Sequence, residues 1–81
     1  MSTNSVKILC EGFNRSSNCI VWGLYRNGVR IAASQVDPIS LRDYAKRECA
    51  RLGIDSYYEE GQVKVSRISY ERKLFEVKIN L

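Results

Sequence analysis

The chain has 81 residues, of which 44% are hydrophobic and 27% charged, and this composition is typical of a globular protein. Thirteen Lys and Arg against nine Asp and Glu give a net charge of +4. A mild basic excess permits binding to nucleic acid or to an acidic protein, but many proteins that bind neither share it. The length predicts a single domain, residues 1–81, with one modest core and no deep cofactor cleft.

Apolar runs in this chain are short. None is long enough to span a bilayer, and Val6 to Cys10 is too short for the core of a signal peptide. The three cysteines, at positions 10, 19 and 49, are widely spaced and odd in number, which is typical of small buried thiols in a reducing compartment. We therefore expect a cytoplasmic protein without a targeting segment or a membrane partner.

The first element predicted is a half-buried strand over residues 5–13, because hydropathy alternates there. Its apolar positions on one side are Val6, Ile8 and Cys10. Gly12 indicates a bend or bulge near the end of this strand. Residues 14–18 are polar and favour turns, so they predict an exposed hairpin tip that carries Arg15.

Residues 19–36 predict a β-hairpin that turns at Asn27-Gly28, because a type I′ turn needs positive φ at both central residues. A two-residue turn here sets Leu24 opposite Ile31 and Trp22 opposite Ala33. The face that we expect to lie in the core carries Ile20, Trp22, Leu24, Val29, Ile31 and Ala33.

One helix is predicted after this hairpin. Ser40 is a suitable N-cap with Asp43 three residues later, and Gly53 ends the helix, with Ile54 folding back as in a Schellman motif. The apolar stripe consists of Leu41, Tyr44, Ala45, Cys49 and Leu52. Glu48 falls inside this stripe. It is either a boundary residue whose carboxylate reaches water or pairs with a neighbouring base, or a functional carboxylate in a shallow pocket.

The last third of the chain predicts a second hairpin. Residues 55–61 combine tyrosines with acids and read as a short edge strand or a structured loop. Residues 62–70 and 74–81 then form strands joined across Glu71-Arg72-Lys73, with a bulge near Ser66-Arg67. In the final strand the inward positions are Phe75, Val77, Ile79 and Leu81.

Together these elements predict an α+β fold: an antiparallel sheet of about five strands with one α-helix packed on one face. The predicted order is β-β-β-α-(β)-β-β. The side chains that we expect to hold the fold together are Trp22, Leu24, Ile31, Leu41, Tyr44, Leu52, Phe75, Val77 and Ile79.

Catalysis has little support in this sequence. The chain has no histidine, so the usual general base near neutral pH and the usual activator of a Ser or Cys nucleophile are missing. It also has no phosphate-binding loop and no close pair of metal ligands. We expect no enzymatic activity, no cofactor and no metal site.

Nucleic-acid binding is one of two functional hypotheses. Arg15, Arg67, Arg72 and Lys73 are the candidate nucleic-acid contacts, with nearby tyrosines as stacking partners. The layout of residues 19–53, with Trp22 and Asn27-Gly28 in the middle, is similar to the small DNA-binding domains of phage integrases and plant AP2 proteins. The strands are less basic here than in such domains, and the run of acids at residues 55–60 disfavours a phosphate track.

Protein binding is the hypothesis that we prefer, because tyrosines next to carboxylates suit an interface with a basic partner surface. The candidate partner-binding residues are Tyr25, Arg30, Tyr57, Tyr58, Glu59 and Glu60. Chain length, the hairpin-helix-hairpin order and the lack of catalytic groups resemble the small phage and prophage accessory proteins of the anti-CRISPR type. This resemblance implies a non-catalytic inhibitor or adaptor that docks on a protein or ribonucleoprotein, and it transfers no functional residue.

Overall fold

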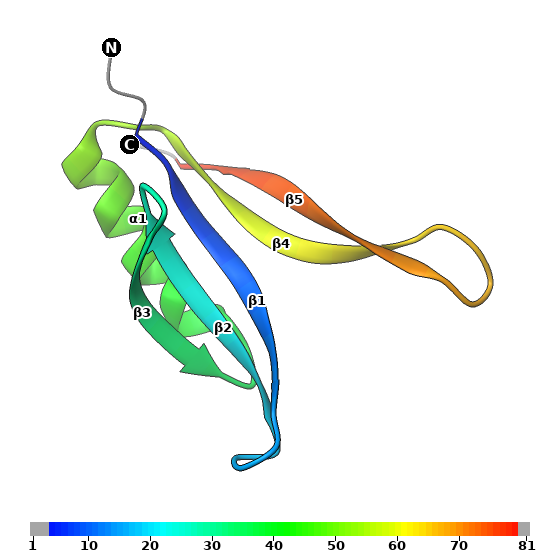
Figure 1. Cartoon of the computed structure of the whole chain (residues 1–81). Coiled ribbons are helices and arrows are strands. Elements are labelled where there is room, and N and C mark those ends of the chain that lie inside the picture. Colours follow the sequence, from blue (N-terminus) through cyan, green and yellow to red (C-terminus); the bar gives the residue numbers. More distant parts are fainter. Residues whose placement is uncertain (1–3, 80–81) are drawn as a thin grey trace.

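The computed structural model describes residues 4–79 and consists of one helix and a five-stranded sheet (Figure 1). The elements are β1 (Val6–Asn14), β2 (Cys19–Arg26), β3 (Val29–Gln35), α1 (Ile39–Leu52), β4 (Ser56–Lys64) and β5 (Tyr70–Lys78). The α+β class and the order β-β-β-α-β-β are confirmed, and the optional extra strand is absent from the described residues. The strands lie side by side in the order β3-β2-β1-β4-β5.

One pair of strands departs from the predicted antiparallel sheet. After β3, the chain crosses the sheet through α1 and enters β4 on the far side of β1, so β4 runs parallel to β1. A crossover connection of this kind is what parallel neighbours require. The parallel pairing is short, with Lys7 opposite Tyr58 and Ile8 opposite Glu59. Beyond this point the β1–β2 and β4–β5 hairpins diverge (Figure 1).

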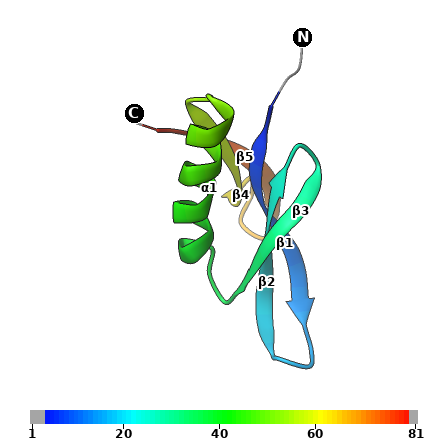
Figure 2. The ribbon, with the colours of Figure 1, turned by 90° about the vertical axis from the view of Figure 1, so that its left-hand side faces the viewer.

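The core lies between α1 and one face of the sheet, as the side view shows (Figure 2). Its fully buried members are Val6, Ile8, Leu24, Leu41, Ala45, Cys49 and Tyr57. The predicted alternation of β1 and the helical stripe are therefore confirmed, since each supplies buried side chains. Partly buried side chains packed around this core include Trp22, Ile31, Tyr44, Leu52, Val77 and Ile79.

Phe75 was wrongly predicted to be a core residue, because 41% of its surface is exposed. It lies on β5, the edge strand of the sheet, and α1 makes no contact with that strand in the described chain, so the helix does not cover Phe75. Leu81, predicted to point inward, lies outside the described residues.

The turn of the first predicted hairpin is confirmed, since Asn27 and Gly28 have φ values of 51° and 82°. The predicted register holds only next to the turn. A register shift between Leu24 and Tyr25 sets Leu24 opposite Ala32 and Trp22 opposite Ser34. An extra residue in β3 thus shifts the rest of that strand by one position relative to β2. Side chains predicted to face the core therefore point to the other face of the sheet, and the reverse.

The exchange changes which residues of this hairpin are buried. Ala32 packs against the core, whereas Ala33 is exposed. Ile20 and Val29, also predicted to be in the core, are 43% and 62% exposed because they lie near the ends of their strands. The predicted bulge at Gly12 is confirmed by a register shift between Cys10 and Gly12.

The predicted N-cap of the helix is wrong. The Oδ1 atom of Asp37 accepts the backbone N–H of Ile39 at 3.0 Å, and the helix begins at Ile39. The hydroxyl of Ser40 instead donates to Ser34 Oγ at 3.2 Å. Asp37, three residues before Ser40, therefore provides the first side-chain acceptor at this end of the helix.

The predicted C-terminal end of the helix is confirmed. Gly53 has the left-handed φ of 72°. The backbone N–H of Ile54 donates to the Cys49 carbonyl at 3.0 Å, as a Schellman motif requires.

The second hairpin was predicted with its turn in the wrong place. The turn comprises residues 65–69, where the Ser69 carbonyl accepts the N–H groups of Val65 and Ser66. Residues 71–73 lie within β5, opposite residues 61–63 of β4. A charged run on an exposed edge strand has the same composition as a turn, and local sequence therefore did not separate them.

Candidate binding site in the cleft and the projecting hairpin

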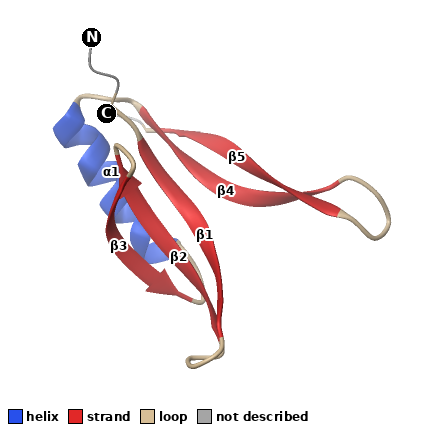
Figure 3. Cartoon of the chain, viewed as in Figure 1, coloured by secondary structure: helices blue, strands red, loops and turns tan. Residues whose placement is uncertain are grey.

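The outer part of the β4–β5 hairpin stands away from the rest of the molecule (Figure 3). We call residues 61–75 the projecting hairpin. Its residues pair only with one another or with the rest of the β4–β5 hairpin in the described sheet, and every β5 residue from Tyr70 to Glu76 is exposed. Its exposed large apolar side chains are Val65, Ile68, Tyr70, Leu74 and Phe75. Apolar side chains left this exposed on one segment are typical of a binding surface.

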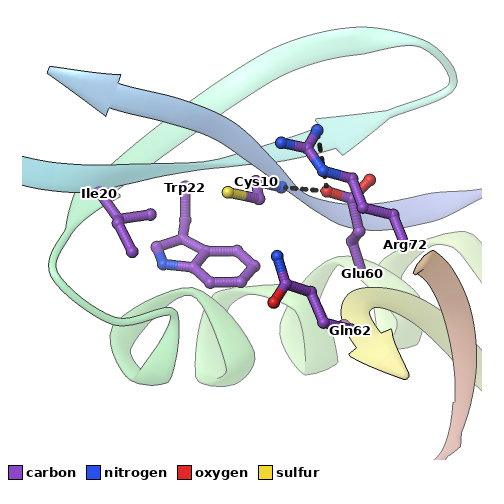
Figure 4. Close-up of a pocket in the computed structure, with 7 residues that line it drawn as sticks. Cys10, Ile20, Trp22, Glu60, Gln62 and Arg72 are labelled. Atoms are coloured by element: carbon purple, nitrogen blue, oxygen red, sulfur yellow. Dashed lines mark hydrogen bonds and ion pairs between the residues drawn. The ribbon is translucent and has the colours of Figure 1, made fainter. Parts of the chain in front are cut away.

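A cleft of about 310 Å³ lies where the two hairpins diverge (Figure 4). Gly61 and the six residues labelled in that view line it: Cys10, Ile20, Trp22, Glu60, Gln62 and Arg72. Trp22 and Ile20, from β2, form an apolar side, whereas β4 and β5 contribute polar and charged side chains. The cleft thus combines an aromatic wall with a few polar groups, as binding pockets commonly do.

Trp22 has a polar atom that finds no acceptor in the described part of the chain. Its indole Nε1 is buried and makes no hydrogen bond within residues 4–79. A buried N–H without a partner carries a desolvation cost.

Glu60 closes the inner end of the cleft. Its Oε1 accepts the backbone N–H of Cys10 at 3.3 Å and lies 3.8 Å from Nη1 of Arg72. The contact comes directly after the last parallel backbone pair, Ile8 opposite Glu59. The carboxylate therefore takes the place of the strand partner that Cys10 lacks.

Tyr25 and Arg30 meet on the opposite face of the sheet, as cross-strand neighbours. Both donate to the carboxylate of Glu11, Arg30 Nη2 over 2.7 Å and the Tyr25 hydroxyl through a short hydrogen bond. This hydrogen bond to Glu11 raises the pKa of the Tyr25 hydroxyl. Gly23 leaves room for the cluster, since a Cβ there would lie 2.9 Å from the Tyr25 ring. Sequence reasoning missed Glu11. Gly12 indicated the bulge beside it, but no local pattern indicated that Glu11 accepts hydrogen bonds from Tyr25 and Arg30.

The predicted segment of tyrosines and acids is not a loop but part of β4, and its side chains point alternately to two faces. Tyr57 is only 2% exposed, so its predicted place on a binding surface is wrong. Burial raises the pKa of its hydroxyl. Glu59 binds Arg42 of α1 through two 2.8 Å hydrogen bonds, and Tyr58 donates to Glu76 at 3.2 Å. The carboxylates of Glu59 and Glu60 are thus both engaged by groups of the same chain.

The candidate nucleic-acid contacts are divided between the two hairpins. Arg15 lies in the turn between β1 and β2, whereas Arg67, Arg72 and Lys73 lie on the projecting hairpin. Lys64, which the sequence reasoning did not select, joins the second group. Residues 61–75 hold four cations and one acid, Glu71, so they carry +3 of the chain's net +4. The projecting hairpin is the basic part of the molecule.

Glu48 has a structural role that agrees with the first of its two interpretations. It is 2% exposed and accepts hydrogen bonds from Arg26 Nη1 at 3.3 Å and Arg51 Nη1 at 3.0 Å. It does not line the cleft. The carboxylate ties α1 to the end of β2.

The cysteines are free thiols, with Cys49 buried and the other two partly exposed. Burial raises the pKa of the Cys49 thiol. Within residues 4–79, no group of three or more His, Cys, Asp and Glu side chains is placed to hold a metal ion. The described helix is also neither long nor apolar enough to cross a membrane.

Comparison with known proteins identifies no relative: no protein family, curated protein or solved structure matches this chain. The resemblances to anti-CRISPR-type proteins and to integrase and AP2 domains therefore stay predictions.

Proposed function

We propose that the protein is a small non-catalytic binding protein, an inhibitor or adaptor, that docks on a protein or ribonucleoprotein partner. The projecting hairpin and the cleft beside it form the docking site. The proposal rests mainly on one observation: Val65, Ile68, Tyr70, Leu74 and Phe75 are all exposed along one hairpin. A lone surface apolar residue is ordinary, but five on one projecting element suit a protein interface.

The cleft suggests what the partner inserts. Trp22 and Ile20 offer an apolar wall, and an apolar side chain of the partner would pack against it. The positive charge of the projecting hairpin favours an acidic surface around that segment, which reverses the earlier expectation of a basic partner.

Two arginines outside the projecting hairpin, Arg30 on β3 and Arg42 on α1, are paired with acids, which also favours protein over nucleic acid. Arg30 is bound to Glu11 at 2.7 Å, and Arg42 to Glu59 at 2.8 Å. Phosphate-binding sheets rely on cations that are free to neutralise phosphates, and here acids of the same chain engage these two.

A second candidate function is nucleic-acid binding by the projecting hairpin. A two-stranded β-ribbon fits the DNA major groove. This ribbon carries Lys64, Arg67, Arg72 and Lys73 against the single acid Glu71. Gel-shift binding that falls steeply with salt, and that is lost in Arg67→Glu, would favour this alternative.

The proposed function is tested by affinity capture from host lysate, with and without nuclease. Ile68→Asp places a charge on the 93% exposed tip, and Ile39→Asp, at a 61% exposed position on the helix, is its control. Ile20→Glu in the cleft is matched by Val29→Glu on β3. We expect a protein to be captured in stoichiometric amount whether or not nuclease is added. Capture should be about tenfold weaker for Ile68→Asp and Ile20→Glu, and unchanged for the two controls. Equal capture by all four variants, or capture that disappears with nuclease, contradicts the proposal.

A further inference from the structure

The outer edge of β5 lies on the side of the projecting hairpin away from the cleft. In the described sheet β5 is an edge strand, and only β4 lies beside it. Its outward N–H and C=O groups are therefore open to another strand. All its residues from Tyr70 to Glu76 are exposed, so no side chain of the described fold covers this edge.

The sequence of β5 is complementary to itself when two copies run antiparallel. Directly opposed residues point to the same face, so a two-fold axis perpendicular to the sheet must pass through one residue position. An axis at Leu74 sets the two Leu74 side chains together. It also sets Arg72 opposite Glu76 of the second copy, and Glu76 opposite the second copy's Arg72.

On the other face, the same axis sets Lys73 opposite Phe75 of the second copy. Within one chain, the Lys73 ammonium lies 5.7 Å from the Phe75 ring centroid, a cation–π contact. In the dimer, Lys73 of each copy can make the same kind of contact with Phe75 of the other copy. Back on the face of Leu74, Tyr70 meets Lys78 of the second copy, which again pairs an aromatic ring with a cation.

Neighbouring registers lack this complementarity. An axis at Phe75 opposes Arg72 to Lys78, and one at Lys73 opposes Arg72 to Leu74 and Glu71 to Phe75. An axis at Arg72 would set the two Arg72 side chains opposite each other, and an axis at Glu76 would do the same with the two Glu76 side chains. Like charges placed directly opposite one another destabilise a sheet, so one register is selected.

Existing contacts leave these charges available. Arg72 is 61% exposed and lies 3.8 Å from Glu60, a distance that is long for an ion pair. Glu76 is 41% exposed, and its Oε1 lies 3.5 Å from Lys78 of the same strand. Its Oε2 accepts the hydroxyls of Tyr58 at 3.2 Å and Ser56 at 3.4 Å. Neither Arg72 nor Glu76 is held in a tight ion pair that a second strand would have to break.

We propose that two copies of this chain associate through β5, antiparallel and centred on Leu74, to join their five-stranded sheets into one. The dimer contact shares the projecting hairpin with the proposed docking site, and Arg72 also lines the cleft. Self-association is measured on the chain alone, however, so the two proposals can fail separately. A single strand edge is smaller than the roughly 800 Å² per partner of a stable interface. We therefore expect a weak, reversible dimer with a dissociation constant of about 100 μM.

Sedimentation equilibrium of the full chain, at concentrations from about 10 μM to about 1 mM, tests this dimer. Arg72→Glu and Glu76→Arg should each weaken self-association at least about tenfold, because each opposes like charges twice. An equimolar mixture of the two variants should restore dimers, since both charge pairs are then complementary. The double variant R72E/E76R should also dimerise, and circular dichroism checks that each variant is folded.

Two controls fix the interpretation. Lys64→Glu makes the same charge change as Arg72→Glu on β4, away from the proposed contact, and should leave the dimer intact. Glu71→Arg faces Val77 in this register and should also leave it intact. A wild-type chain that stays monomeric at about 1 mM overturns the proposal, as charged edge strands often serve to prevent pairing. Failure of the mixture to dimerise, or loss of the dimer in Glu71→Arg, overturns it equally.

Discussion

The carboxylate of Glu60 accepts the backbone N–H of Cys10 across 3.3 Å, at the point where β1 and β4 cease to pair. This contact lets the parallel pairing end without leaving the Cys10 amide unsatisfied. It also fixes the inner end of the cleft between the hairpins. The junction between the two hairpins, and with it the inner end of the candidate site, thus contains a hydrogen bond made by one side chain.

Removal of the Glu60 carboxylate should therefore loosen this junction. We expect Glu60→Ala to reduce the free energy of unfolding by about 1 kcal/mol and to speed hydrogen exchange at the Cys10 amide about fivefold. Exchange measured by NMR provides the readout. Glu60→Gln keeps an oxygen acceptor and should preserve most of the protection. Unchanged Cys10 exchange in Glu60→Ala would contradict this account of the junction.

Glu48 allows a test of the buried ion pair. Its side chain is 3% exposed, whereas those of Arg26 and Arg51 are 34% and 68% exposed. Glu48→Leu should therefore change the free energy of unfolding by less than about 1 kcal/mol, because both arginines can reach water. Arg26→Met combined with Arg51→Met should cost about 3 kcal/mol, because it leaves a buried carboxylate alone. Urea titration measures both, and equal losses would refute the explanation.

Val36 has φ of 76°, a conformation that is costly for a β-branched residue. Its side chain is 67% exposed, so a substitution there loses little packing. Val36→Asn should raise the melting temperature by about 4 °C, because asparagine tolerates the left-handed region. Val29→Asn is the matched control at a 62% exposed position within β3, where asparagine disfavours the strand. No difference between the two variants would show that Val36 is unstrained.

Stability should fall at alkaline pH because Cys49 and Tyr57 have raised pKa values in the folded chain, chiefly through burial. Below their ordinary values of 9.0 and 10.0 both groups keep their protons in the folded and unfolded states. As the pH rises past these values, the unfolded chain releases its protons first, and stability is progressively lost up to the folded pKa values.

Urea unfolding between about pH 8 and pH 11 measures this loss. Tyr57→Phe and Cys49→Ala should each flatten the decline, because each removes one of the thiol and hydroxyl groups with a raised pKa, of which Tyr25 is the third. Tyr58→Phe, at a position 36% exposed on the same strand, is the control and should leave the profile unchanged. A decline identical in all variants would assign the alkaline loss to other groups.

Where the sequence predicted structure correctly, the information was local. Positive φ at Asn27 and Gly28 makes the turn between β2 and β3. Gly53 ends the helix through backbone hydrogen bonds to the carbonyls of the last helical turn. The alternation around Val6 and Ile8 predicted which side of β1 is buried. Each signal depends on residues a few positions apart, and turns, caps and alternation can therefore be read directly.

The candidate site could be predicted only in part. Arg67, Arg72 and Lys73 were selected as surface cations and do lie together on the projecting hairpin. Trp22 was assigned to the core, and it is half-buried there while also forming the wall of the cleft. Nothing local indicated this second role, because the wall exists only where β4 turns away from β1.

By itself, the sequence determined the α+β class, the order of elements, the first turn and the helical stripe, because these follow from periodicity and turn chemistry. Tertiary structure alone decided that β4 runs parallel to β1, that Tyr57 is buried and that β3 is shifted by one residue. These features depend on which strands pair although they lie far apart in the sequence, and on how much of the sheet the helix covers. The cleft, the projecting hairpin and the free edge of β5 all result from that long-range choice.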